Sequence, residues 1–154
     1  GSVTTDGTVL INDPLLTRIN LSKRQVQDSV EKTKGEIRER LQAYGKADNF
    51  QKRYEEVIPG KSIFMLDDGL ASGFTMLAAI KMVKKYDPKE IFVAVPTAPK
   101  HTVDRVEVKA KKVFCPNIKN TRWFAVANAY KHWYDVPQEE VLNILGDSAH
   151  YHGD

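Results

Sequence analysis

The stretch from Ile63 to Thr75 decides the fold, and it reads Ile-Phe-Met-Leu-Asp-Asp-Gly-Leu-Ala-Ser-Gly-Phe-Thr. The apolar run Ser62 to Leu66 predicts a short strand. Two adjacent carboxylates, Asp67 and Asp68, follow it, and a loop of small residues leads into a predicted helix over Gly73 to Tyr86. In open α/β sheets, ligands bind outside the carboxyl ends of the strands. The segment therefore predicts an α/β fold and a ligand site together.

The residue types after this strand suit a ribose that carries a phosphate. A helix N-terminus offers unpaired backbone N–H groups and a partial positive charge, which favour a phosphate. Gly69 and Gly73 let the backbone approach a ligand closely, and the hydroxyls of Ser72 and Thr75 add hydrogen bonds. The two carboxylates suit sugar hydroxyls or a divalent metal.

The sequence that follows this segment predicts two further strands of the same sheet. We expect strands over Ile91 to Val95, ended by Pro96, and over Val113 to Cys115, with a helix over Thr102 to Lys111 between them. This order of elements predicts a parallel sheet with flanking helices and right-handed crossovers. Two more helices are predicted, over Thr121–Tyr134 and Gln138–Leu145.

The N-terminal part predicts a hairpin and one long helix. Asp6-Gly7 separates two β-prone runs, Ser2 to Thr5 and Thr8 to Asn12, and supplies a tight turn. Ser22 and Gln25 have the spacing of a capping box. An apolar stripe at helical spacing then follows, formed by Val26, Val30, Ile37 and Leu41.

Composition favours one domain over residues 1–145 with a polar tail over 146–154. The chain has 154 residues, 42% hydrophobic and 28% charged, which suits one globular core. Its longest charge-free stretch, Gly69 to Ile80, is too short to cross a membrane. Cys115 is the single cysteine, which excludes an internal disulfide. With no signal peptide visible, we expect a cytoplasmic protein.

The motif from Phe64 to Thr75 resembles the signature of the type I phosphoribosyltransferases. That signature has an apolar run, two acidic residues, and then a loop of apolar and small residues that ends in Thr or Ser, Gly, any residue and Thr. In that family the acidic pair binds the ribose hydroxyls of phosphoribosyl pyrophosphate (PRPP), and the loop cradles the 5′-phosphate. The resemblance therefore implies a PRPP site formed by Asp67, Asp68, Gly69, Ala71, Ser72, Gly73, Phe74 and Thr75.

Weaker resemblances extend over residues 2 to 145. Val93 to Pro99, Phe124 to Val126 and the hairpin around Asp6-Gly7 look like an uncharacterised prokaryotic branch of the family. The resemblance implies transfer of phosphoribose to a nitrogenous base or amine, with release of pyrophosphate and Asp67 and Asp68 as the catalytic pair. It also implies Mg²⁺, carried mainly by PRPP and placed near that pair.

One departure from the family concerns the start of the chain. Full-length members carry a further N-terminal region before the hairpin, with core strands and a loop that holds pyrophosphate. We therefore expect the chain to be a fragment that alone does not transfer phosphoribose. Its sheet would expose apolar area, so it should aggregate, form a homo-oligomer, or exist beside the rest of its protein.

Two other functions stay open at this point. One is a non-catalytic module of the same fold that senses PRPP or a nucleotide. The other is RNA binding, because residues 81–131 hold twelve bases and four acids. The net charge of only +3 makes a nucleic-acid partner the weaker hypothesis. A receiver domain is excluded, since neither later strand ends in a phospho-accepting aspartate.

The remaining candidates have simpler interpretations. Position alone supports a ligand contact for His101, and we interpret Cys115 as buried. Arg38, Arg40 and Lys46 surround a polar connection over residues 43–60, where the family often has a mobile loop that closes over PRPP. His150 and His152 belong to the tail, without the spacing of a metal site. His132 and the aromatic residues of the predicted helix are assigned to packing: Phe124, Tyr130, Trp133 and Tyr134.

Overall fold

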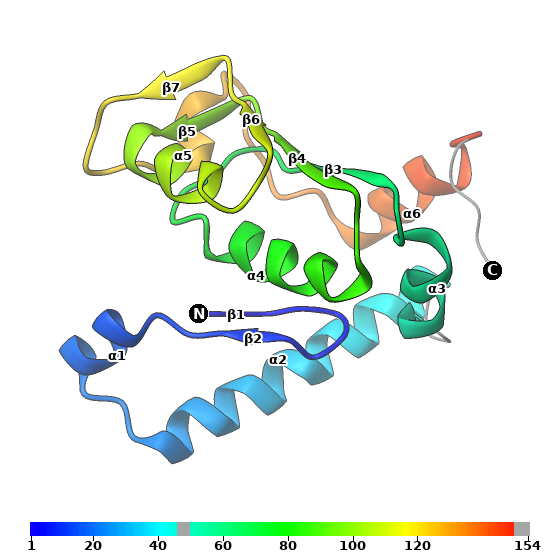
Figure 1. Ribbon diagram of the computed structural model, residues 1–154, viewed down its shortest axis with the longest axis horizontal. Coiled ribbons are helices and arrows are strands. Elements are labelled where there is room, and N and C mark those ends of the chain that lie inside the picture. The colour runs from blue at the N-terminus through cyan, green and yellow to red at the C-terminus, as the bar shows by residue number, and fades with distance from the viewer. Residues whose placement is uncertain (46–49, 150–154) are drawn as a thin grey trace.

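A parallel sheet of three strands forms the centre of the molecule in the computed structural model, which describes residues 1–45 and 50–149. Its strands are β3 (Ser62–Leu66), β4 (Glu90–Ala94) and β6 (Lys112–Phe114), in the order β3-β4-β6 (Figure 1). Ile63 lies opposite Ile91 and Val93 opposite Val113. The predicted α/β fold with a parallel sheet is confirmed. The predicted bounds of β3 match, and those of β4 and β6 differ by one residue at each end.

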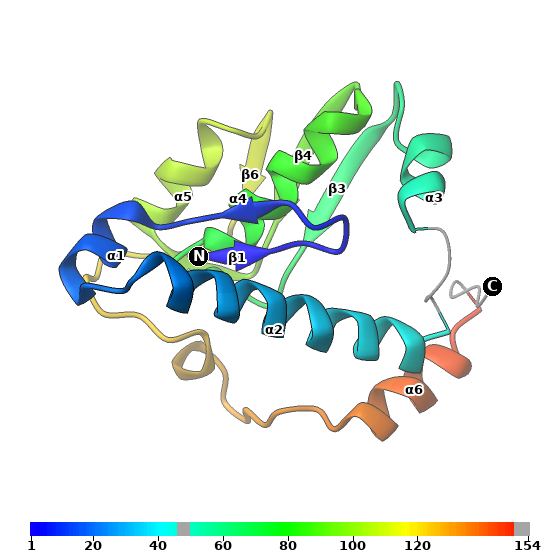
Figure 2. The same cartoon turned by 90° about the horizontal axis from the view of Figure 1, so that it is seen from below.

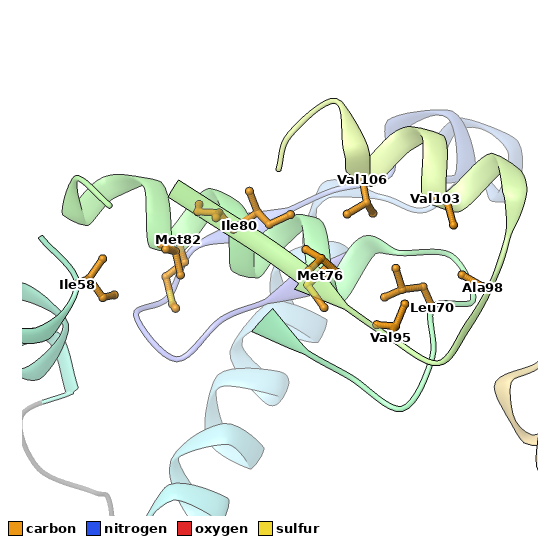
Figure 3. Packing of buried hydrophobic residues seen from close by; sticks show 12 residues of the cluster. Ile58, Leu70, Met76, Ile80, Met82, Val95, Ala98, Val103 and Val106 are labelled. Carbon is orange, nitrogen blue, oxygen red and sulfur yellow. The ribbon is translucent and has the colours of Figure 1, made fainter. Parts of the chain in front are cut away.

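The two helices between these strands cover the same face of the sheet. Helix α4 (Phe74–Val83) connects β3 to β4 and continues into the 3-10 turn η1 (Lys84–Tyr86), and α5 (Lys100–Glu107) connects β4 to β6. Right-handed crossovers that step in one direction place both helices on one face. The resulting core gathers side chains of α4 and α5 with Val93 of β4. Figure 3 labels further members of this core, among them Met76, Ile80, Val103, Val106 and Val95, which follows β4 directly.

Two short strands prolong the sheet at its carboxyl edge. Strands β5 (Thr97–Pro99) and β7 (Asn117–Lys119) pair in parallel. The Val95 N–H donates to the Phe114 carbonyl at 2.9 Å, and the Asn117 N–H donates to the Pro96 carbonyl at 3.2 Å. Strand β4 ends at Ala94, so the prediction that the strand stops at Pro96 is confirmed to within one residue. Proline lacks an N–H donor, but its carbonyl still accepts from the neighbouring chain, and β5 and β7 pair just beyond it.

The N-terminal hairpin lies on the outer side of α4. Strands β1 (Ser2–Val3) and β2 (Val9–Leu10) pair antiparallel and contact α4, and α2 (Lys23–Ala43) lies beyond them (Figures 1 and 2). The predicted hairpin is confirmed, with shorter strands. Gly7 takes the positive φ of 81° that the turn requires. The sheet, α4, the hairpin and α2 thus form successive layers.

Both helices of this N-terminal layer have side-chain caps. Helix α1 (Asp13–Ile19), which the sequence did not predict, starts at Asn12, whose side chain accepts from the Leu15 N–H at 3.2 Å. The predicted capping box of α2 is confirmed. The Gln25 N–H donates to the Ser22 hydroxyl at 3.2 Å, and the Ser22 N–H donates to the Gln25 side chain at 2.9 Å.

Asp6 fixes the hairpin to the end of α4. Its nearly buried carboxylate accepts from the Thr4 and Thr8 hydroxyls at 2.6 Å each, and lies 2.9 Å from the Lys85 ammonium. Burial by itself would raise the pKa of this carboxyl, but the hydrogen bonds from Thr4, Thr8 and Lys85 hold it well below its ordinary value. The carboxylate therefore stays charged and holds two layers together.

The predicted polar connection over residues 43–60 contains a helix. Helix α3 (Phe50–Val57) precedes Ile58, which is buried, and the rings of Tyr54 and Tyr86 lie 5.5 Å apart. Arg38 and Arg40, which the sequence analysis places beside this connection, lie in the last two turns of α2. Lys46 lies outside the described residues, as do His150 and His152.

The predicted helix over Thr121–Tyr134 does not form. Its only regular element is the 3-10 turn η2 (Val126–Ala129). After this turn the chain passes the carboxyl ends of the strands and reaches α6 (Gln138–Gly146), whose predicted position is confirmed (Figure 2). Three of the four aromatic residues assigned to packing are exposed, namely Tyr130, Trp133 and Tyr134, and so is His132, whereas Phe124 is partly buried.

No helix within residues 1–45 or 50–149 combines the length and apolar character that crossing a bilayer requires.

Candidate functional site

The acidic pair stands where the sequence placed it, directly after β3 at the carboxyl edge of the sheet. Asp67 and Asp68 are both exposed, and the Asp68 N–H donates to Oδ1 of Asp67 at 3.0 Å. Partial burial raises the pKa of Asp67, and the nearby charge of Asp68 raises it further, while this hydrogen bond acts against the shift. The exposed acceptors can therefore receive hydroxyl groups of a ligand.

Gly69 lets the acidic loop pack closely against two other segments. A Cβ atom at this position would lie 2.7 Å from Cγ1 of Val126 and 3.1 Å from Cγ2 of Thr97. The next residue, Leu70, is buried, and its N–H donates to the Thr97 carbonyl at 3.0 Å. The loop is thereby fixed against β5 and η2, which explains why only glycine fits there.

The small-residue loop ends at the N-terminus of α4. Gly73 precedes the helix with a positive φ of 73°, and no side-chain hydrogen bond caps the helix. Ser72 offers only a long contact, in which its hydroxyl accepts from the Phe74 N–H at 3.4 Å. The first N–H groups of α4 are thus available to an anion, which a helix N-terminus favours by its dipole.

Thr75 also lines a hollow on the outer side of α4. This hollow has a volume of about 470 Å³ and lies between the hairpin, α2 and α4. Arg40 lines it as well. Arg40, near the C-terminal end of α2, and Thr75 therefore border the same space.

Three side chains hold the loop between β3 and α4 by donating hydrogen bonds to its backbone carbonyl groups. The sequence analysis did not assign these side chains to the site. The Thr102 hydroxyl donates to the Ala71 carbonyl at 2.7 Å, and Nη1 of Arg105 donates to the Ser72 carbonyl at 3.1 Å. The Tyr130 hydroxyl donates to the Asp68 carbonyl at 2.6 Å. Every residue has a backbone carbonyl, so the residue types in a sequence do not show which carbonyl will accept a hydrogen bond. No sequence signal therefore pointed to these three side chains.

The other candidates lie farther from this loop or differ from their prediction. His101 is exposed in the first turn of α5, one residue before Thr102. Cys115 is partly buried, and burial raises the pKa of its thiol, which matches a packing role better than a nucleophilic one. Trp133 packs edge-on against Tyr130 with ring centroids 5.3 Å apart.

Part of the basic excess lies at the opposite edge of the sheet. Lys84, Lys89, Lys109 and Lys111 line a hollow of about 460 Å³ beside Glu90 and Ile91, at the amino end of β4. One of them, Lys111, lies 3.4 Å from Glu90. These lysines are therefore not available to a ligand at the acidic pair.

The acidic pair is also the only part of this loop that could face a metal. Among residues 1–45 and 50–149, no three His, Cys, Asp or Glu side chains gather closely enough to hold an ion. Two adjacent carboxylates do suit Mg²⁺ that arrives with substrate phosphates, because this ion commonly uses one or two carboxylates together with phosphate oxygens.

Comparisons with known proteins agree on one family. A family model described as a phosphoribosyl transferase domain matches residues 10–133. Two proteins from Mycobacterium tuberculosis, strains CDC 1551 and H37Rv, each named "Putative phosphoribosyl transferase", are 26% identical over 151 residues. These matches cover 97% of this chain and 32% of each relative, so the chain spans about a third of their length.

A solved structure shares the fold. The crystal structure of TT1426 from Thermus thermophilus aligns with a TM-score of 0.59 and 24% identity, and the alignment covers 88% of this chain and 61% of that one. The matched family model includes β3, the acidic pair, the small-residue loop and α5. The chain therefore belongs to the phosphoribosyl transferase domain family.

Proposed function

We propose that this part of the chain binds the ribose 5-phosphate portion of PRPP. The supporting observation is the exposed acidic pair, followed within one loop by the uncapped N-terminus of α4. Asp67 and Asp68 accept hydrogen bonds from the ribose hydroxyls. The loop from Ala71 to Thr75 binds the 5′-phosphate through its N–H groups and the hydroxyls of Ser72 and Thr75.

For the intact protein we propose transfer of the phosphoribosyl group to a nitrogen nucleophile. The bond from C1 to the pyrophosphate oxygen breaks, a bond from C1 to nitrogen forms, and the nitrogen loses a proton to solvent. Binding at both ends of the ribose orients C1 toward the nucleophile. The carboxylates of Asp67 and Asp68 stabilise positive charge that develops on the sugar. Asp67 and Asp68 would lie near a Mg²⁺ ion that PRPP brings, and such an ion would supply positive charge against the departing pyrophosphate.

Calorimetry with PRPP and Mg²⁺ tests the binding proposal. Replacing both acids, Asp67→Asn with Asp68→Asn, should weaken binding, because hydrogen bonds to charged groups contribute about 1.5–3 kcal/mol each. The matched control is another adjacent acidic pair, Glu55→Gln with Glu56→Gln on the exposed side of α3, which removes the same charge. Binding that responds equally to both double variants would reduce the effect to net charge and contradict the ribose contact.

Turnover separates an enzyme from a sensor of the same ligand. Pyrophosphate release from PRPP, measured over a panel of bases and amines, is expected from the intact protein. Binding of PRPP without release for any acceptor would favour the non-catalytic module. RNA binding that weakens with salt and survives the loss of both aspartates would replace the proposal altogether.

A further inference from the structure

Helix α5 holds two consecutive carbonyl groups of the phosphate loop. Thr102 and Arg105 lie three residues apart, so they share one side of the helix. Thr102 donates to the Ala71 carbonyl at 2.7 Å, and Arg105 donates to the Ser72 carbonyl at 3.1 Å. Both bonds therefore draw the carbonyl side of the loop toward α5.

The planarity of the peptide bond gives these contacts a consequence on the other side of the loop. In a trans peptide the carbonyl and the N–H of one unit point in opposite directions. The Ser72 N–H belongs to the same unit as the Ala71 carbonyl, and the Gly73 N–H to the same unit as the Ser72 carbonyl. Both N–H groups are thus turned away from α5, and neither donates a hydrogen bond within the described part of the chain.

Helix α5 is itself rigidly placed. Thr102 is fully buried at 0% exposure. Val103 and Val106 of the same helix enter the hydrophobic core (Figure 3). The methyl group of Thr102 also excludes a side chain at Gly73, since a Cβ atom there would lie 2.7 Å from this methyl group. On the exposed side, the Arg105 guanidinium lies 5.8 Å from the centre of the Phe74 ring.

We propose that Thr102 and Arg105 are positioning residues that preset the phosphate loop, with its N–H groups facing the anion before the ligand arrives. A loop held in its binding conformation loses less conformational freedom on binding, so affinity for the phosphate is higher. The inference rests on the proposed function, because it assumes that the loop binds the 5′-phosphate. Neither side chain needs to touch the ligand for this effect.

Thr102→Val is the sharpest test, since it keeps the branched shape and the methyl group but removes the donor. The probes are ribose 5-phosphate and inorganic phosphate, titrated by calorimetry or NMR into the full chain. Loss of one hydrogen bond should weaken binding of both probes by the same factor, about three- to tenfold. Thr102→Ser restores the hydroxyl and should regain most of the affinity, which a purely steric role would not allow.

Two comparisons separate the possible failures. The double aspartate variant should weaken ribose 5-phosphate but not inorganic phosphate, because only the sugar contacts the acids. Wild-type protein that binds neither probe would overturn the proposed function and this inference with it. Wild-type binding together with unchanged affinities in Thr102→Val would overturn this inference alone.

Arg105 provides the second variant, because it is exposed and its loss leaves the buried core intact. Arg105→Lys keeps the positive charge but replaces the planar guanidinium, with its fixed donor geometry, by a compact ammonium on a flexible stem. A positioning role predicts weaker binding in Arg105→Lys, with the same salt dependence as wild type. Affinity that is retained in Arg105→Lys and lost only in Arg105→Gln would assign the effect to charge and overturn the positioning role of Arg105.

Discussion

Both faces of the central sheet carry large apolar side chains, but these differ sharply in burial. Ile91 and Val93 point under α4 and α5 and are 4% and 0% exposed. Phe64 and Leu66, on the opposite face of the neighbouring strand, are 60% and 74% exposed. Residue type therefore did not decide which of these side chains are buried. Burial follows from the direction of the two crossover connections, because they place both α4 and α5 on one face of the sheet.

The exposed face is nevertheless ordered by its own side chains. Phe64 stacks on Phe92 with ring centroids 4.9 Å apart, and Phe92 lies 6.4 Å from Phe114. The Lys112 ammonium lies 4.8 Å from the centre of the Phe114 ring. Each such aromatic pair adds only about 0.5–1.5 kcal/mol beyond its buried area. The comparison teaches that most of the stability comes from the covered face.

The largest predicted effect is a truncation on the covered side. Ile80 of α4 is 1% exposed, and Ile80→Ala should lower the free energy of unfolding by about 2–5 kcal/mol, since it leaves a cavity. Leu66→Ala on the exposed face should change it by about 0.5 kcal/mol or less. Urea unfolding measures both variants. Equal losses would show that the exposed face is covered in solution.

The second prediction concerns the hairpin that lies beyond α4. Asp6→Asn weakens charged hydrogen bonds to Thr8 and Lys85 and should cost about 1.5–3 kcal/mol. Because the pKa of Asp6 is lowered in the folded chain, its contribution is present above the ordinary aspartate pKa and is lost as pH falls through the folded value. Unfolding followed against pH measures this loss.

The control for Asp6 is an exposed ion pair on the same N-terminal layer. Asp28 lies 4.0 Å from Arg24, and both side chains are open to solvent. Asp28→Asn should change stability by well under 1 kcal/mol. If both variants lost the same stability, the buried carboxylate of Asp6 would not be the link between the hairpin and α4.

The third prediction concerns the carboxyl edge of the central sheet, where Tyr130 of the C-terminal segment contacts the loop after β3. Tyr130→Phe removes the hydroxyl that donates to the Asp68 carbonyl and should cost about 0.5–1.5 kcal/mol. It should also raise hydrogen exchange in the loop from Asp67 to Leu70. Tyr134→Phe is the matched control, because its hydroxyl contacts Glu140 instead. Faster exchange of that loop in both variants would contradict a specific contact.

The parts of the fold that the sequence predicted correctly depend on local patterns. Strand β3, the loop after it and α4 follow from an apolar run, two glycines and a second apolar run, all within one segment. The capping box of Ser22 and Gln25 is equally local. Such signals need no knowledge of distant residues, so one short segment was enough to locate the candidate site.

The parts that the sequence predicted wrongly depend on distant contacts. The helix over Thr121–Tyr134 fails to form where Val126 packs on Gly69 and Tyr130 reaches Asp68, about sixty residues earlier in the chain. Tertiary contacts of this kind override helix propensity. The roles of Thr102 and Arg105 were missed for the same reason, because their partners are backbone carbonyls of a remote loop.

The smallest predicted effect has the opposite sign and concerns Asp67. Burial and the charge of Asp68 raise the pKa of Asp67 in the folded chain, so its ionised form opposes folding. Asp67→Asn should therefore stabilise the free protein near neutral pH, by a few tenths of a kcal/mol for so exposed a group. The gain should vanish below the ordinary aspartate pKa, where the carboxyl is protonated in both states.

Thermal unfolding at several pH values measures this gain, with exposed Asp135→Asn as the control for loss of one surface charge. The same Asp67→Asn variant should bind PRPP more weakly, so stability and binding should change in opposite directions. A variant that loses stability at neutral pH would mean that the carboxylate supports the loop. Asp67 would then have a structural role, like Asp6, and would not be a ligand-binding residue.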